Sequence, residues 1–302
     1  MTLQATIASA TRQTSLRTYA ILILAIVAFG FSAIFARLAD APGMVVATWR
    51  VSIATAVLAV PFARQTAAQR RLDRRTRRWA LIGGTIFAAS VALFHVALDY
   101  TTAANATFLG NIAPLWVGLI TLVVLRRALP RLFWPGVAVA LTGAALIVFG
   151  NGGLTGVSPG DLIVLFSSVI WAAYQVITGE ARARMSTLTW VWLIVAVACV
   201  ELVMVSLLLG EALAGYNLKT TLAMLGAGLV SQVGGFLGFN YALGHIPALQ
   251  VSVANMLQPV ITAVAAFILL GEPFGGWRLV GGALILAGVY LVNHSRHAGV
   301  EA

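Results

Sequence analysis

The sequence predicts an all-α polytopic membrane protein, with ten transmembrane helices arranged as two inverted five-helix repeats around a central cavity. Three observations lead to this fold class: long apolar runs, Arg clusters between those runs, and an internal repeat. Of the 302 residues, 60% are hydrophobic and 9% are charged, and the mean hydropathy is +0.95. Because average soluble proteins are about 25% charged, this composition argues against a disordered chain, a nucleic-acid-binding module and an ordinary cytosolic enzyme.

The apolar runs supply the ten predicted spans. A bilayer core of about 30 Å needs roughly 20 apolar residues in a helix, and backbone polar groups in lipid must be satisfied within the segment. Each long apolar run is therefore predicted to be helical. The ten runs are residues 19–38, 45–62, 79–98, 102–125, 133–149, 161–178, 188–209, 220–243, 248–270 and 279–293.

The basic residues predict how these spans are oriented. If the N-terminus is cytoplasmic, 15 of the 19 Lys and Arg residues fall on the cytoplasmic side, and seven of them lie in the Arg-rich loop 63–78. Basic residues beside spans favour the cytoplasmic face. We therefore expect a multi-pass protein of the cytoplasmic (inner) membrane with both termini in the cytoplasm. The same distribution explains the net charge of +10 without a nucleic-acid partner.

An internal repeat divides the chain into residues 19–150 and 161–294. A shift of 145 residues aligns Pro114 with Pro259. The same shift superimposes further identical pairs, namely Phe94 and Phe239, Gly136 and Gly281, and Gly143 and Gly288. Each half has five spans, and because five is odd, the second half enters the membrane in the opposite orientation. Inverted halves are common in secondary transporters, which bind their solute near the midplane at the repeat interface.

Four short motifs carry a family resemblance. They are Asn-Ile-Ala-Pro at 111–114, Leu-Gln-Pro at 257–259, Leu-Leu-Gly-Glu-Pro at 269–273 and Trp-Ala-Ala-Tyr at 171–174. With the five-plus-five plan, they make the chain resemble the EamA-type transporters of the drug/metabolite transporter superfamily, and its length and aromatic-rich spans look most like the YddG-type amino-acid exporters. The resemblance implies that the first, third, fourth, sixth, eighth and ninth spans line the cavity, with the fifth and tenth at the periphery.

Polar side chains inside spans are costly and mark substrate paths unless they are satisfied structurally. Asn111 precedes Pro114, and Asn255 and Gln258 precede Pro259. Each proline predicts a helix kink, because it removes a backbone hydrogen bond and frees a carbonyl about one turn earlier. The neighbouring amides could bind a substrate or could mend the broken helix, and the sequence leaves both alternatives open.

Three further spans supply the rest of the candidate site. Trp171, Tyr174 and Gln175 share one helical face, because they are spaced at i, i+3 and i+4. Gln232 lies near the middle of its span, and His95 could be a ligand or a packing residue held by Asp99. The predicted substrate-binding residues are His95, Asn111, Trp171, Tyr174, Gln175, Gln232, Asn255 and Gln258.

The intramembrane charges narrow the class of solute. Glu201 is the carboxylate well inside a predicted span, and Arg50 is a candidate ion-pair partner for it or could snorkel to the surface. The first span has no Asp or Glu, whereas some small relatives in the superfamily use a carboxylate there for proton-coupled export of cations. A lining of amides and rings favours a neutral or zwitterionic solute, because a multiply charged one would need paired charges.

These observations predict a secondary transporter that exports small neutral or zwitterionic metabolites, including aromatic amino acids, by alternating access. A multidrug, nucleoside or sugar transporter is the alternative, and a membrane-embedded lipid enzyme or a channel is less favoured. Neither G-x-x-x-x-G-K-[ST] nor G-x-S-x-G occurs in the sequence, and its four His residues show no metal-ligand spacing. We therefore predict no catalytic residues, cofactor or metal, and expect small-molecule substrate and lipid as partners.

Glycine faces in three spans bear on assembly, and the one in the eighth span consists of Gly234, Gly235 and Gly238. Gly136 and Gly143 in the fifth span, like Gly281 and Gly288 in the tenth, would let backbones approach closely. The sequence does not decide between intramolecular packing, a dimer contact and gating flexibility for these faces. A monomer or a weak dimer is expected.

Overall fold

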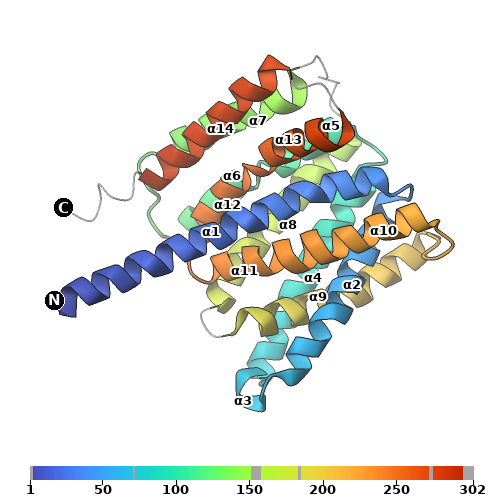
Figure 1. The fold of residues 1–302 in the computed structure, drawn as a ribbon, viewed down its shortest axis with the longest axis horizontal. Coiled ribbons are helices and arrows are strands. Elements are labelled where there is room, and N and C mark those ends of the chain that lie inside the picture. The colour runs from blue at the N-terminus through green and yellow to red at the C-terminus, as the bar shows by residue number, and fades with distance from the viewer. Residues whose placement is uncertain (1–2, 71, 151–157, 183–184, 272–274, 295–302) are drawn as a thin grey trace.

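The computed structural model describes residues 3–70, 72–150, 158–182, 185–271 and 275–294, and these residues form a helical bundle without strands (Figure 1). The helices of the first half follow in chain order: α1 (Leu3–Leu38), α2 (Gly43–Arg64), α3 (Ala67–Arg70), α4 (Arg74–Ala97), α5 (Ala103–Gly110), α6 (Ala113–Leu119), the π-helix η1 (Ile120–Val124) and α7 (Phe133–Phe149).

The second half repeats this plan. Its helices are α8 (Pro159–Arg182), α9 (Thr187–Leu208), α10 (Leu218–Gly226), the π-helix η2 (Ala227–Gly235), α11 (Phe236–Leu243), α12 (Ala248–Asn255), α13 (Gln258–Leu270) and α14 (Gly276–His294). In both halves, the fourth membrane segment is broken into consecutive helices.

The predicted all-α polytopic membrane fold is confirmed. Within the described residues, nine helical stretches are long and apolar enough to cross a membrane, and Phe133–Phe149 is a shorter apolar helix. This shorter helix has 17 residues and is about 25 Å long at 1.5 Å per residue. Each of the ten predicted runs coincides with one of these helical stretches, so the apolar pattern was a reliable guide to where the chain crosses.

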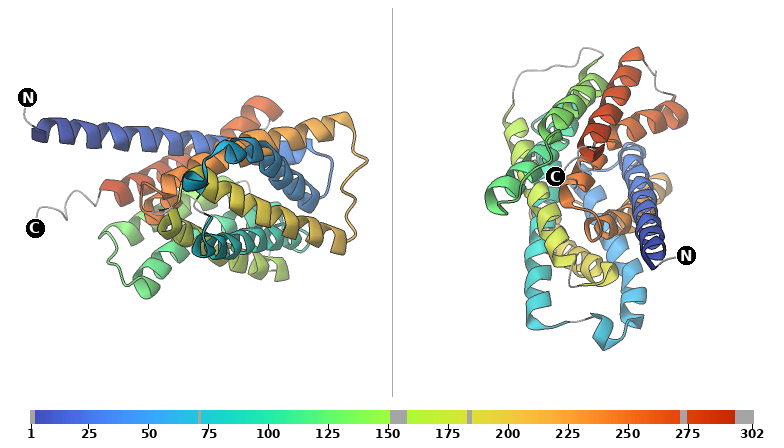
Figure 2. Two further views of the ribbon diagram at one scale, coloured as in Figure 1. Left: turned by 90° about the horizontal axis from the view of Figure 1, so that it is seen from below. Right: turned by 90° about the vertical axis from the view of Figure 1, so that its left-hand side faces the viewer.

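Helix ends differ from the predicted boundaries mainly in two segments that carry basic residues, namely the one before the first span and the loop 63–78. α1 begins at Leu3, well before the apolar run, and its first turns project beyond the rest of the bundle (Figure 2). The predicted Arg-rich loop 63–78 is largely helical, because α2 continues to Arg64, α3 forms, and α4 starts at Arg74. Asp73 sets the start of α4, since its Oδ1 accepts a hydrogen bond from the Thr76 backbone N–H at 2.6 Å.

Both proline-containing segments are interrupted at equivalent places. α5 gives way to α6 at residues 111–112, and α12 gives way to α13 at residues 256–257, so the two breaks are separated by the same 145-residue shift. Pro114 and Pro259 lie in the first turns of α6 and α13. A missing backbone N–H costs little in a first turn, because that donor has no intrahelical partner there.

The two halves interlock through contacts that recur when the halves are exchanged. α1 packs on η2 and α13 of the second half, and α8 packs on α4 and α6 of the first half. The two second spans, α2 and α9, pack on each other, as do the two last spans, α7 and α14, which lie side by side at one edge (Figure 1). This is the contact pattern of an approximate two-fold axis between the halves.

α1 begins, and α14 ends, at the same end of the bundle (Figures 1 and 2). We call this the termini end, and the opposite end the far end. The helices alternate in direction, so α8 and α11 run toward the termini end, whereas α1 and α4 run toward the far end.

The glycines of α7 and α14 hold these helices in close contact. A Cβ added at Gly136 would lie 2.8 Å from the Gly288 carbonyl oxygen, and one added at Gly281 would lie 2.6 Å from the Gly143 carbonyl oxygen. Such distances leave no room for a side chain. These glycines therefore serve packing within the chain.

Candidate functional site

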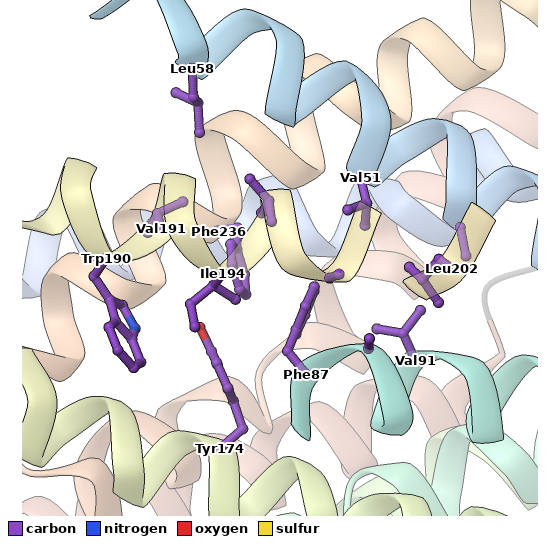
Figure 3. Packing of buried hydrophobic residues seen from close by; sticks show 14 of the residues in the cluster. Val51, Leu58, Phe87, Val91, Tyr174, Trp190, Val191, Ile194, Leu202 and Phe236 are labelled. Carbon is purple, nitrogen blue, oxygen red and sulfur yellow. The ribbon is translucent and has the colours of Figure 1, made fainter. Parts of the chain in front are cut away.

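An aromatic cluster fills the middle of the bundle, where both halves contribute. Trp171 and Tyr174 of α8 stack with their ring centroids 5.2 Å apart, and Trp171 also stacks on Phe239 at 5.7 Å. Phe87 of α4 lies 5.5 Å from the Tyr174 ring and 4.7 Å from Phe236. Figure 3 shows Tyr174, Phe87 and Phe236 pointing toward one another from three different helices.

A buried polar network continues from this cluster to the termini end. The Tyr174 hydroxyl donates to Asn240 Oδ1 at 2.6 Å, and the Asn240 amide donates to the Phe236 carbonyl at 2.8 Å. The buried Arg182 guanidinium donates from Nε to the Asn240 carbonyl at 3.3 Å, from Nη2 to Thr187 Oγ1 at 2.6 Å, and from Nη1 to the Met185 carbonyl. The network thereby fastens α8, α9 and α11 together at the termini end.

The amides at the break in the ninth span lie close to the aromatic cluster. Gln258 Nε2 lies 3.5 Å from the Phe29 carbonyl of α1, and Asn255 Nδ2 lies 3.5 Å from Gln258 Oε1. Both distances are at the long limit for a hydrogen bond. Phe29 in turn contacts Phe239, with ring centroids 5.5 Å apart. The structure therefore brings Trp171, Tyr174, Asn255 and Gln258 into one region.

Three predicted residues have a buried polar atom without a partner, and one of these atoms is Asn255 Oδ1. Gln175 is 1% exposed and its Oε1 has no hydrogen-bond partner, while Gln232 is 2% exposed and its Nε2 has none. Gln232 lies in η2, where the backbone adopts the π-helical pattern that is frequent at functional sites. A buried polar atom without a partner costs free energy, so the burial of the Gln175 and Gln232 amides lowers the stability of the fold.

The remaining two predicted residues, Asn111 and His95, each bond a backbone carbonyl of their own helical segment. Asn111 Nδ2 donates to the Thr107 carbonyl at 2.7 Å, which satisfies a backbone acceptor beside the α5–α6 break. His95 Nδ1 bonds the Val91 carbonyl at 2.8 Å, whereas Asp99 is exposed at the end of the segment. Asp99 therefore does not hold His95 as the sequence analysis suggested, because the ring already has a partner one turn earlier.

The expected ion pair between Glu201 and Arg50 is wrong. Glu201 Oε1 accepts a hydrogen bond from Thr85 Oγ1 of α4 at 2.6 Å. Arg50 Nη1 donates instead to Ser32 Oγ of α1 at 2.9 Å, and its Nε is buried without a partner. The two residues belong to neighbouring helices but lie on different faces, which sequence spacing within one helix does not reveal.

Sequence reasoning also missed Phe87 and Arg182 as neighbours of the candidate site. Phe87 looked like an ordinary apolar residue, and Arg182 looked like one more basic residue flanking a span. Asn240 carried a usable signal, since the 145-residue shift aligns it with His95. Within the described residues, no group of three or more His, Cys, Asp or Glu side chains is placed to hold a metal ion.

The fold and this interior define a class: a multi-pass helical membrane protein whose two halves meet around aromatic and amide side chains. The EamA-like transporter family matches the chain twice, at residues 16–149 and 158–294. The chain therefore belongs to the EamA-like transporter family.

Relatives with assigned names are transporters. An "Uncharacterized transporter" of Archaeoglobus fulgidus is 31% identical over 223 residues, which cover 72% of this chain and 75% of the relative. A "Probable terminal-alkyne amino-acid exporter" of Streptantibioticus cattleyicolor is 29% identical over 244 residues, or 81% of this chain and 82% of the relative. A "Probable amino-acid metabolite efflux pump" of Salmonella typhimurium is 27% identical over 182 residues, or 56% and 60%.

The fold is also found in a solved crystal structure. That structure superimposes with a TM-score of 0.81, at 17% sequence identity, and the match covers 94% of this chain and 99% of the other. At this identity, the likeness shows the fold alone.

Proposed function

We propose that this transporter exports small neutral or zwitterionic metabolites, amino acids including aromatic ones, across the cytoplasmic membrane by alternating access. The observation that carries the proposal is the aromatic and amide interior at the meeting of the two halves, described for Trp171, Tyr174 and Gln258. Aromatic faces suit an apolar side chain, and amides suit the polar groups of a zwitterion. Two relatives named for amino-acid export support the same class of solute.

The transport mechanism in this proposal uses two inverted repeats, residues 19–150 and 161–294. The interchanged contacts of the two halves support it, because a two-fold axis in the membrane plane makes the inward and outward faces equivalent. Both termini lie in the cytoplasm in this proposal, which follows the excess of basic residues on that side. The protein works as a monomer or a weak dimer and requires no cofactor.

The proposed substrate-contacting residues differ in what they offer. Trp171 and Tyr174 provide ring faces, and Gln258 and Asn255 provide amides at the α12–α13 break. Gln175 and Gln232 each provide a polar atom that the protein leaves unsatisfied. His95 and Asn111 complete the set, although the Asn111 amide also satisfies the Thr107 carbonyl of its own helix.

Counterflow in proteoliposomes tests the function. The full chain is reconstituted, loaded with an unlabelled amino acid, and assayed for uptake of the labelled one, with and without a pH gradient. Saturable uptake that is accelerated by internal substrate is expected for phenylalanine or leucine. Saturable counterflow of only cationic drugs or nucleosides would assign the alternative substrates, and flux without saturation or counterflow would indicate a channel.

Single substitutions test the site. Trp171→Ala, Gln258→Ala, Asn111→Ala and Tyr174→Phe are expected to lower counterflow, with the loss about tenfold for Trp171→Ala, since aromatic contacts of this kind are worth about 1 kcal/mol or more. Trp277→Ala, at an exposed tryptophan of α14, serves as the control for loss of an indole. Membrane abundance is measured for each variant, and four normally active variants would reject the site.

A further inference from the structure

Arg50 is a charge that has no counter-ion among the residues that the structure describes. It is the eighth residue of α2, so its Cα lies about 10 Å along the helix from the far end at 1.5 Å per residue. No carboxylate among the described residues forms an ion pair with it. An ionisable side chain at such a position inside a membrane is expensive and marks a functional site unless it is paired.

The surroundings of Arg50 place it inside the bundle. Its Nη1 reaches Ser32 of α1, and two turns earlier on the same face of α2, a Cβ added at Gly43 would lie 3.1 Å from His95 Cδ2 of α4. Ile53, on the adjoining face of α2, packs against Gly228 of η2. The guanidinium therefore belongs to the junction of α1, α2, α4 and η2, which are helices from both halves.

The donors of Arg50 are only partly used. Ser32 takes one donor from Nη1, while Nε is buried and has no acceptor. Nε and Nη2 form the side edge of a guanidinium, and this edge matches the two oxygens of a carboxylate. On η2, which packs against α2, Gln232 Nε2 is a second buried donor without an acceptor.

Two unsatisfied acceptors lie on a different pair of helices. Gln175 Oε1 of α8 and Asn255 Oδ1 of α12 are buried without donors, and α8 packs against α12. Of these four unsatisfied atoms, the two donors therefore lie on the packed pair α2 and η2, and the two acceptors lie on the packed pair α8 and α12. A zwitterion, with acceptor oxygens at one end and N–H donors at the other, has the complementary arrangement.

We propose that Arg50 is the anchor for the carboxylate of the transported solute. The inference rests on the proposed function and sharpens it, because it requires a free carboxylate on the solute. The carboxylate accepts from the Nε–Nη2 edge after the long side chain turns to present it, and the ammonium faces the acceptors of α8 and α12. The apolar side chain then lies toward Trp171.

The test compares acids with their carboxamides. Binding of phenylalanine, leucine, phenylalaninamide and leucinamide to the purified full chain in detergent is measured by thermal shift, and counterflow is measured in proteoliposomes. Arg50→Gln is expected to weaken the binding of both acids by about ten- to hundredfold, the range for hydrogen bonds to charged groups. It is expected to change the binding of the two carboxamides by less than about twofold. Arg50→Lys is expected to retain part of the preference for acids over carboxamides, because lysine keeps the positive charge but lacks the two parallel N–H donors of the guanidinium.

The control is Arg64→Gln, which removes an exposed charge at the other end of α2 and should behave like the unchanged protein. A purely structural Arg50 would show itself in stability: Arg50→Gln would then lower the melting temperature and weaken acids and amides equally. Removal of a charge that lacks a counter-ion should instead leave the melting temperature unchanged or raise it. Equal loss for acids and amides, or unchanged acid binding, overturns the inference.

Failure of the proposed function gives a different result. If the unchanged protein neither binds nor exchanges any amino acid, export of amino acids is rejected, and the Arg50 inference is judged with 3-phenylpropionate and its amide in the same thermal-shift assay. Stabilisation by the carboxylate that Arg50→Gln abolishes supports the anchor for a carboxylate of another kind. Absence of any stabilisation by the carboxylate overturns it.

Discussion

Arg182 at the termini end and Arg50 toward the far end are two arginines inside the bundle whose donors are satisfied to different degrees. At the termini end, Asn240 accepts the Tyr174 hydroxyl and Arg182 donates to three acceptors. At the far end, the 145-residue shift puts His95 in the place of Asn240, and His95 bonds only its own helix. Arg50, the half-buried arginine of α2 toward that end, retains a buried donor without a partner.

The difference teaches that a charged side chain inside the bundle does not always belong to a bonded network. The Arg182 network ties three helices together. The far end combines a satisfied network, in which Asp161 accepts from Thr101, Asn105 and the Ser158 backbone N–H, with Arg50, whose Nε has no partner. A transporter with alternating access closes one end while it binds at the other. Three substitutions test how far the contrast between satisfied and unsatisfied polar groups extends.

Arg182→Gln is expected to have the largest effect on stability. It leaves the Asn240 and Met185 carbonyls and Thr187 Oγ1 without their buried donor, which should cost about 3 kcal/mol of unfolding free energy. Chemical denaturation in mixed micelles measures the change. Arg127→Gln is the control, because its ion pair with Glu180 is exposed, with side chains 62% and 47% exposed, and should be worth less than about 1 kcal/mol. Equal effects would show that the termini-end network is not specially stabilising.

Gln232→Leu is expected to separate stability from transport. Its Nε2 is buried without a partner, so an apolar side chain of similar size should leave the unfolding free energy unchanged or raise it. Counterflow should nevertheless fall about tenfold if the amide binds the solute. Gln250→Leu is the matched control, since the buried Gln250 amide is within 3.4 Å of the Tyr19 hydroxyl and its loss should lower stability slightly. A Gln232→Leu protein that is less stable and equally active would refute this assignment.

Asp73→Ala is expected to have the smallest effect, at the start of α4. Hydrogen bonds from Thr76 hold the pKa of the Asp73 carboxyl below its ordinary value, with Arg75 and Arg77 adding to the effect. A lowered pKa in the folded state stabilises the protein above the unfolded pKa, and this contribution is lost as pH falls through the folded value. The melting temperature should therefore drop slightly at pH 7 and converge with that of the unchanged protein in acid. Asp73→Asn, which keeps the capping oxygen, should retain most of the stability, and a difference that grows in acid would contradict the assignment.

Local sequence signals were sufficient for much of the fold. The apolar runs located the membrane helices, because a lipid environment forces each run to satisfy its own backbone. Pro114 and Pro259 located the two helix interruptions, because proline acts on the turn in which it lies. Trp171 and Tyr174 were correctly placed on one face of α8, because the helical period fixes that relation.

Contacts between side chains of different helices could not be predicted from local sequence signals. The sequence suggested Glu201 for Arg50 and Asp99 for His95, and the structure gives Ser32 and Val91. Both errors arise because complementary charge or favourable spacing says which groups could pair, whereas the rotation of each helix about its axis decides which groups face each other.

By itself, the sequence determined that this chain is an all-helical, multi-pass membrane protein, and it predicted ten spans in two halves that repeat one plan. Only the tertiary structure decided that Tyr174, Asn240 and Arg182 form one network, and that Arg50 lies inside the bundle with no ion-pair partner in the described part of the chain. The physical reason is that hydropathy and proline act within a single helix, while hydrogen bonding between side chains depends on how separate helices pack.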